Sequence, residues 1–141
     1  MLIPDINVLI YAQDTTSPFH QPAHNWWLEA LAGGTEIGLP WIVVLGFIRI
    51  TTNGRLGSRA LTVPKAISHV RNWLTQPRVR ILPPGERHGE ILFDLLEKLG
   101  TGGNLTTDAH LAALAIEYHG VIVSWDNDFA RFPGLRWRKP F

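Results

Sequence analysis

The stretch from residue 104 to 129, NLTTDAHLAALAIEYHGVIVSWDNDF, constrains the fold more than any other part of the chain. Its apolar residues at positions 111, 114, 115 and 118 recur at helical spacing and predict a helix with one buried face. Thr106 or Thr107 is expected to cap this helix, and Gly120 is expected to end it. The apolar run at residues 121 to 123 is typical of a strand that is buried on both faces of a parallel sheet.

Three aspartates flank this predicted helix and strand. Asp108 falls in the first turn of the helix, and Asp126 and Asp128 follow the strand. Binding groups collect at the carboxyl ends of parallel strands, so the three carboxylates are expected on one rim of the sheet. The stretch contains no Lys or Arg that would neutralise them, which makes a bound cation their natural partner.

A fourth aspartate lies near the start of the chain, in the sequence MLIPDINVLIYA. Asp5 falls where a short strand beginning at Leu2 and Ile3 should give way to an apolar helix. Taken alone, Asp5 is best explained as a helix cap that complements the positive end of the helix dipole. Four of the six aspartates, however, fall at strand and helix junctions that a parallel sheet would bring together. We therefore predict that Asp5 joins the other three.

Clustered carboxylates are suited to phosphodiester hydrolysis, because a divalent ion activates water and neutralises charge on the phosphate. Hard oxygen ligands favour Mg²⁺ or Mn²⁺. A protein nucleophile is not indicated, since the chain has no cysteine and Ser124 has no evident histidine partner. Our hypothesis places Asp5 and Asp108 directly on the metal and Asp126 on the metal or its water, with support from Asp128, Asn7 and Thr107.

Three motifs together carry a family resemblance: PDINVLIYA, TDAHLAALA and SWDNDFARFPGLRW. They resemble the PIN domain and, more closely, the VapC toxins of bacterial VapBC toxin–antitoxin pairs, from Asp5 to Trp137. The resemblance implies a metal-dependent endoribonuclease with Asp5, Asp108 and Asp126 around Mg²⁺ or Mn²⁺ and with Asp128 as an additional carboxylate. It also implies an RNA substrate, a VapB-type antitoxin whose tail enters the active-site groove, and a homodimer.

One position departs from the family pattern. The family usually has a Glu, an apolar residue and an Arg in the second helix, and here Gly46 stands where the Glu is expected. A site with one fewer negative charge should hold metal more weakly, or hold one ion where a complete site holds two. The alternative is a catalytically weakened PIN-fold module that binds RNA or a protein without turnover. Arg49, which is retained, is expected to pair with a carboxylate.

Three other kinds of site fit the sequence less well. A haloacid-dehalogenase-like phosphatase needs a second aspartate two residues after the first, where Asn7 stands. A receiver-like phosphoacceptor needs a lysine at the end of a late strand, and only Lys139, at the terminus, is close. His20 and His24 have the spacing of a metal pair, but no third ligand is apparent, so surface or partner contacts are expected.

The 141 residues predict one domain, residues 1 to 141. Alternating strands and helices predict a three-layer α/β/α sandwich with a mainly parallel sheet of four or five strands. The helices are expected at residues 6–12, 23–31, 41–53, 62–76, 86–99 and 106–119, and further strands at 35–39, 79–82 and 135–137.

Composition limits the setting and the partners. The absence of cysteine fits the reducing cytoplasm, and the longest apolar run, residues 41 to 48, is too short to span a membrane. The net charge of +1 argues against massive nonspecific nucleic-acid binding. The positive charge is mostly arginine, which suits phosphate recognition. Arg55, in the predicted loop at residues 53 to 58, is expected either to contact substrate or to belong to a solvated loop.

Overall fold

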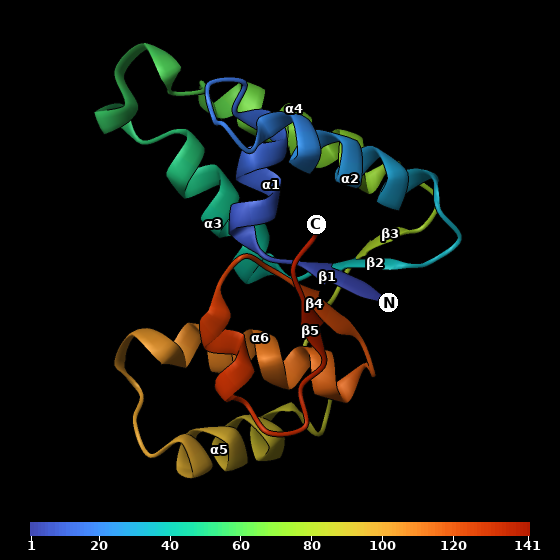
Figure 1. Cartoon of the computed structure of the whole chain (residues 1–141), viewed down its shortest axis with the longest axis vertical. Coiled ribbons are helices and arrows are strands. Elements are labelled where there is room, and N and C mark those ends of the chain that lie inside the picture. Colours follow the sequence, from blue (N-terminus) through green and yellow to red (C-terminus); the bar gives the residue numbers. More distant parts are fainter.

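Five short strands form a wholly parallel sheet at the centre of the computed structural model, which describes residues 1–141 (Figure 1). The strand order is β3-β2-β1-β4-β5. The strands are β1 (Leu2–Pro4), β2 (Ile37–Leu39), β3 (Val79–Ile81), β4 (Val121–Val123) and β5 (Trp137–Arg138). The predicted parallel sheet is therefore confirmed, at the upper end of the expected strand number.

Helices cover both faces of this sheet, which gives the predicted three layers (Figure 1). On one face lie α1 (Ile6–Gln13), α2 (His20–Ala32), α3 (Trp41–Thr51) and α4 (Val63–Leu74). On the other face lie α5 (His88–Leu99) and α6 (Thr106–Glu117). Three 3₁₀ helices complete the fold: η1 (Gly54–Arg59), η2 (Gly103–Leu105) and η3 (Asn127–Arg131). No helix is long and apolar enough to cross a membrane.

The buried residues show which side chains of the apolar runs form the core. Ile3 of β1 and Ile122 of β4 are paired across the sheet and completely buried. On the α1–α4 side, Trp73 packs against Phe47 and Trp27, with ring centroids 4.8 and 5.7 Å away. Trp27 is buried and the adjacent Trp26 is only partly so, because neighbouring residues on a helix cannot both face one core.

Three local predictions were wrong. The second helix begins at His20, three residues earlier than expected, because Pro22 fits the first turn, where no backbone N–H donor is needed. The segment after α3 is the 3₁₀ helix η1, in which the Asn53 side chain accepts a hydrogen bond from the backbone N–H of Arg55. Neither Thr106 nor Thr107 caps α6, since η2 leads directly into this helix and Leu105 takes the cap position without a side-chain bond.

The parallel arrangement brings the two ends of the chain together. β1 and β4 are neighbours, so Asp5 and Ser124, the residues that follow them, lie at the same edge of the sheet. The backbone N–H of Asp5 donates to the carbonyl oxygen of Val123, 2.9 Å away. A site at this edge can therefore combine residues more than 100 positions apart.

Candidate active site

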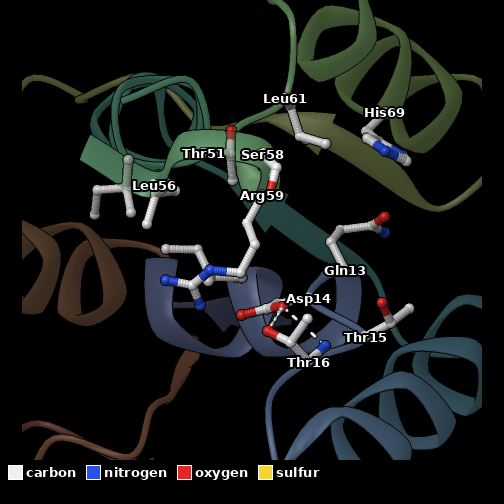
Figure 2. A pocket seen from close by; sticks show the side chains of 12 residues that line it. Gln13, Asp14, Thr15, Thr16, Thr51, Leu56, Ser58, Arg59, Leu61 and His69 are labelled. Atoms are coloured by element: carbon white, nitrogen blue, oxygen red, sulfur yellow. Dashed lines mark hydrogen bonds between the residues drawn. The ribbon is translucent and has the colours of Figure 1, made fainter. Parts of the chain in front are cut away.

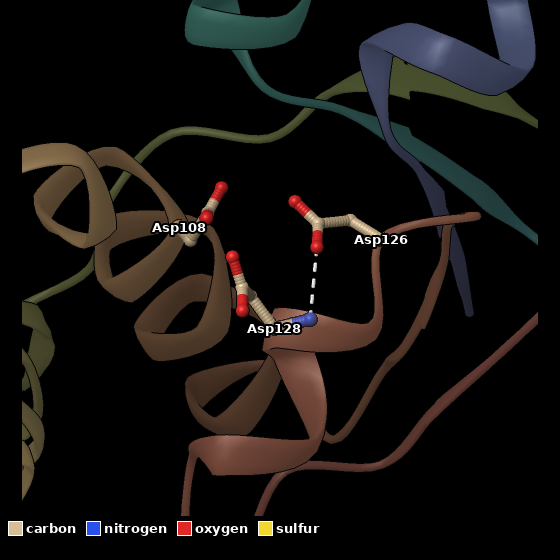
Figure 3. Close-up of side chains that lie close together, drawn as sticks. All are labelled: Asp108, Asp126 and Asp128. Atoms are coloured by element: carbon tan, nitrogen blue, oxygen red, sulfur yellow. Dashed lines mark hydrogen bonds between the residues drawn. The ribbon is translucent and has the colours of Figure 1, made fainter.

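Three carboxylates converge at the carboxyl edge of the sheet (Figure 3). Asp108 comes from the first turn of α6, Asp126 precedes η3 and Asp128 lies in its first turn. One oxygen from each carboxylate lies within 4.8 Å of the others. The backbone N–H of Asp128 donates to Oδ1 of Asp126 at 2.8 Å, which fixes the two residues relative to each other. This spacing of hard oxygen donors suits a small divalent cation.

Asp5 lies beside this group rather than within it. It is buried and caps α1, where its Oδ1 accepts a hydrogen bond from the backbone N–H of Ile6 at 2.8 Å. Its Oδ2 accepts a bond from the Ser124 hydroxyl at 2.7 Å and a weaker one from the Asn7 amide at 3.3 Å. The expected cap and the expected proximity to the other aspartates thus occur together.

Ser124 connects the two halves of the site, and no pattern in the sequence indicates this role. Its side chain is fully buried at the end of β4. While donating to Asp5, its Oγ accepts hydrogen bonds from the Asn7 amide at 3.1 Å and from the backbone N–H of Asp126 at 3.0 Å. Asn7 Oδ1 also accepts from the backbone N–H of Trp125 at 3.3 Å. Asn7 therefore contacts Asp5 directly and reaches Asp126 through Ser124.

Burial and, after it, nearby negative charge raise the pKa values of Asp5 and Asp108. Burial raises the pKa of Asp5, and the nearby Asp126 raises it further, while hydrogen bonds from Ser124 and Ile6 act in the opposite direction. The pKa of Asp108 rises to about 6, chiefly through burial and then through repulsion by Asp126, Asp5 and Asp128. All four carboxylates are therefore close enough to interact electrostatically, and a cation among them would relieve this repulsion.

We expect Ser124→Ala to destabilise the protein by about 1–3 kcal/mol, because Asp5 and the N–H of Asp126 lose their buried hydrogen-bond partner. Urea unfolding measures this change in the free energy of unfolding. Ser68→Ala on the exposed surface of α4 is the control and should change it by no more than about 0.5 kcal/mol. Equal effects of the two substitutions would contradict the role of Ser124.

Gly46 lies in α3, where the side chain of Ile6 takes the space that a Cβ would need. A Cβ at this position would be 2.2 Å from Cδ1 and 2.9 Å from Cγ1 of Ile6, the residue after Asp5. The position where the family usually has a glutamate is therefore filled by an apolar side chain from α1.

The remaining predicted residues make no hydrogen bond or ion pair with the carboxylates. Arg49 is exposed and forms no ion pair, so the prediction of a buried pair was wrong: its side chain reaches solvent from the last turn of α3 and needs no counter-charge. Thr107 is exposed in the first turn of α6 and makes no hydrogen bond to the carboxylates. Arg55 is exposed on η1, which lies near the carboxyl end of α1, whereas Asp5 caps the amino end.

A hollow of about 360 Å³ lies between η1 and the end of α1 (Figure 2). Asp14, Arg59 and His69 are among its lining residues. The pKa of Asp14 is lowered, chiefly by the hydrogen bond from the Thr16 hydroxyl at 2.6 Å. An eight-residue helix is about 12 Å long. Because α1 has that length, this hollow lies at some distance from the acidic cluster and is not part of it.

A histidine pair joins α5 to α6 and was not expected from the sequence. Nε2 of His88 lies 2.9 Å from Nδ1 of His110, and the two rings meet edge to face. One ring must donate and the other accept, so at least one of them is neutral. Burial and then the neighbouring His88 lower the pKa of His110. The two residues are 22 positions apart and belong to different helices, so no local pattern indicates their contact.

Comparisons with known proteins agree with this geometry. A family model described as "PIN domain" matches residues 2–135. Ribonuclease VapC33 of Mycobacterium tuberculosis is 49% identical over 99% of this chain and 98% of its own length. Ribonuclease VapC37 of the same organism is 46% identical over 99% and 97%.

Solved structures show the same fold at lower sequence identity. VapBC2 from Rickettsia felis, bound to a DNA fragment from its promoter, matches with a TM-score of 0.71 and 20% identity, over 98% of this chain and 97% of the other. VapBC-1 from nontypeable Haemophilus influenzae matches with a TM-score of 0.68 and 20% identity, over 99% and 97%.

Proposed function

The chain belongs to the PIN-domain family and, within it, to the VapC ribonucleases, and from this we propose that it is a metal-dependent endoribonuclease and the toxin of a VapBC pair. The observation that carries the metal-dependent part is the convergence of the Asp108, Asp126 and Asp128 oxygens within 4.8 Å, with Asp5 as a fourth carboxylate beside them. Mg²⁺ or Mn²⁺ is the ion that this donor set favours.

The residues of the site have different roles toward a bound ion. When bound, a divalent ion lowers the pKa of a water and neutralises charge on the phosphate. Asp108, Asp126 and Asp128 supply the donor oxygens, and the turn between Asp126 and Asp128 keeps two of them in register. Asp5 adds negative charge from the end of β1, and Ser124 and Asn7 hold its carboxylate in place. Arg55 remains our candidate for a substrate contact outside the cluster.

The proposed partners are a VapB-type antitoxin and a second copy of the chain. Similar solved structures are VapBC complexes, which supports an antitoxin for this chain as well. Large apolar side chains are exposed on both sides of the sheet, Trp41 on α3 and Phe93 on α5. Such side chains favour protein contacts when they occur in patches. Light scattering on the purified chain measures whether it is a dimer.

The test of the proposed activity is a cleavage assay on total RNA with purified, antitoxin-free protein. We expect cleavage with Mg²⁺ or Mn²⁺, none in EDTA, and recovery when the ion is added back. Cleavage that is equally fast in EDTA would refute the metal dependence. RNA binding without scission under every metal condition would instead favour the module without turnover, in which the change at Gly46 has removed activity.

A further inference from the structure

A hollow of about 430 Å³ opens between α3 and the starts of α1 and α6. Its apolar walls include Ile6, Ile42 and Leu45, and its polar lining residues are Arg49 and Thr107. The predicted role of Arg49 as a structural ion pair is wrong, and the cluster of carboxylates does not include it. The hollow and its arginine are thus features that the acidic site leaves unexplained.

The hollow is continuous with the acidic site along the chain. Ile6 directly follows Asp5, and Thr107 directly precedes Asp108. A polymer whose phosphate lies on the carboxylate cluster therefore has this hollow as an immediate neighbour. The absence of a side chain at Gly46 and the position of Ile6 over it shape the hollow's inner wall.

The positive charge of Arg49 indicates that the hollow binds an anionic group. Arg49 is exposed, carries a positive charge and forms no ion pair. A phosphate that approaches four carboxylates is repelled by them, and the unpaired positive charge of Arg49 on the hollow would offset this repulsion for a phosphate bound there. Arginine binds phosphate through two parallel hydrogen bonds, which also fixes the orientation of the bound group.

The apolar walls suit the other half of a nucleotide. The side chain of Leu45 is 58% exposed at the hollow, although burial would stabilise it. A flat base that lies against Leu45 and Ile42 would cover this apolar surface. Bases are free to enter such a site only in unpaired RNA, because a duplex keeps them stacked inside the helix.

We propose that this hollow binds the nucleotide adjacent to the scissile phosphate of a single-stranded RNA, with Arg49 on its phosphate and Leu45 and Ile42 against its base. This inference rests on the proposed ribonuclease function and names the form of RNA that the site accepts. Arg49 is here a substrate-binding residue, and Leu45 helps to determine which bases fit.

The experiment measures binding of a fluorescein-labelled, mixed-sequence 12-nucleotide RNA in EDTA, so that cleavage plays no part in it. We expect Arg49→Gln to weaken binding about tenfold at 0.1 M salt, and the slope of log affinity against log salt to fall by about 0.7, as for the loss of one phosphate contact on a single strand. Leu45→Ala should weaken binding about fivefold with no change in slope, because an apolar contact is lost.

Arg78→Gln is the matched control, since this exposed arginine precedes β3 at the opposite, amino-terminal edge of the sheet. It should leave both affinity and slope unchanged. The proposal is overturned if Arg49→Gln and Arg78→Gln have equal effects, or if Arg49→Gln leaves the salt slope as it was. It is also overturned if Arg49→Gln weakens only the binding of an antitoxin, or if the loss of RNA binding merely follows a change in the protein's mass by light scattering.

These outcomes are separate from the proposed activity. Arg49-dependent RNA binding together with no metal-dependent cleavage would refute the ribonuclease proposal and leave the nucleotide hollow in place. Metal-dependent cleavage together with RNA binding that does not depend on Arg49 would support the ribonuclease proposal and refute the nucleotide-binding hollow.

Discussion

Asp108→Asn is expected to reduce metal-dependent RNA cleavage by about a hundredfold or more. Removing a residue that only orients a metal ligand can already cost up to about a hundredfold, and Asp108 is a proposed ligand itself. Asp108 contributes an oxygen to the three-carboxylate group, and asparagine removes its charge at nearly constant shape. The measurement is the initial rate of RNA cleavage at saturating Mg²⁺, with circular dichroism to verify the fold. Asp94→Asn is the matched control, since Asp94 only pairs with Lys98 on the exposed face of α5. Wild-type rates in Asp108→Asn would contradict the assignment.

The same substitution should change how stability depends on pH. The folded protein holds the Asp108 proton up to a pKa of about 6, whereas the unfolded chain releases it near the ordinary value of 3.8. The stability that this proton contributes is therefore complete below pH 3.8 and is lost as the pH rises to about 6. In EDTA, Asp108→Asn should thus gain stability relative to wild type as the pH rises from 4.5 to 7.5. Because Asp108 is partly exposed, we discount the full shift and expect about 1 kcal/mol.

Urea unfolding of both proteins at the two pH values measures this difference and cancels the titration of groups that they share, among them His110. Mg²⁺ should stabilise the wild type more at pH 7.5 than at pH 4.5, because the ion binds the ionised carboxylates. It should stabilise Asp108→Asn much less. A difference between the two proteins that does not change with pH would contradict the charge crowding at this site.

Gly46→Ala is expected to destabilise the protein by up to about 1 kcal/mol, because a Cβ displaces the end of the Ile6 side chain, which is only partly buried and borders an open hollow. Gly46→Glu should cost at least as much, since its Cβ meets the same Ile6 atoms. Both losses are measured as free energies of unfolding in urea.

Truncating Ile6 should reverse the sign of this effect. In an Ile6→Ala background the space is open, and Gly46→Ala should then stabilise α3 by up to about 1 kcal/mol, since alanine is the better helix former. Gly89→Ala is the matched control in α5, where a Cβ would meet only Phe93 at 3.9 Å, an ordinary contact. It should be neutral or stabilising in both backgrounds. An equal loss from Gly46→Ala with and without Ile6 would show that their contact is not the cause.

Local patterns were sufficient to predict most of the secondary structure and the sheet. Apolar runs such as that of β4, followed by aspartates, indicate strands that end at a binding edge, and helical spacing in α6 identifies its buried face. These patterns involve residues that are close together in the chain, so the sequence alone is enough to detect them. The starts of α2 and α6 were misplaced because Pro22 is compatible with the first turn of a helix and because η2 leads directly into α6 without a side-chain cap.

The sequence by itself therefore determined a parallel α/β sheet and the edge at which Asp5, Asp108, Asp126 and Asp128 gather, since strand direction alone brings those positions together. Only the tertiary structure decided which carboxylates share a donor group, that Ser124 bridges Asp5 to Asp126, and that Ile6 occupies the space at Gly46. It also decided that Arg49 stays unpaired beside a hollow. These features depend on distances between side chains of different elements, which are set by packing and rotamers and leave no periodic trace in the chain.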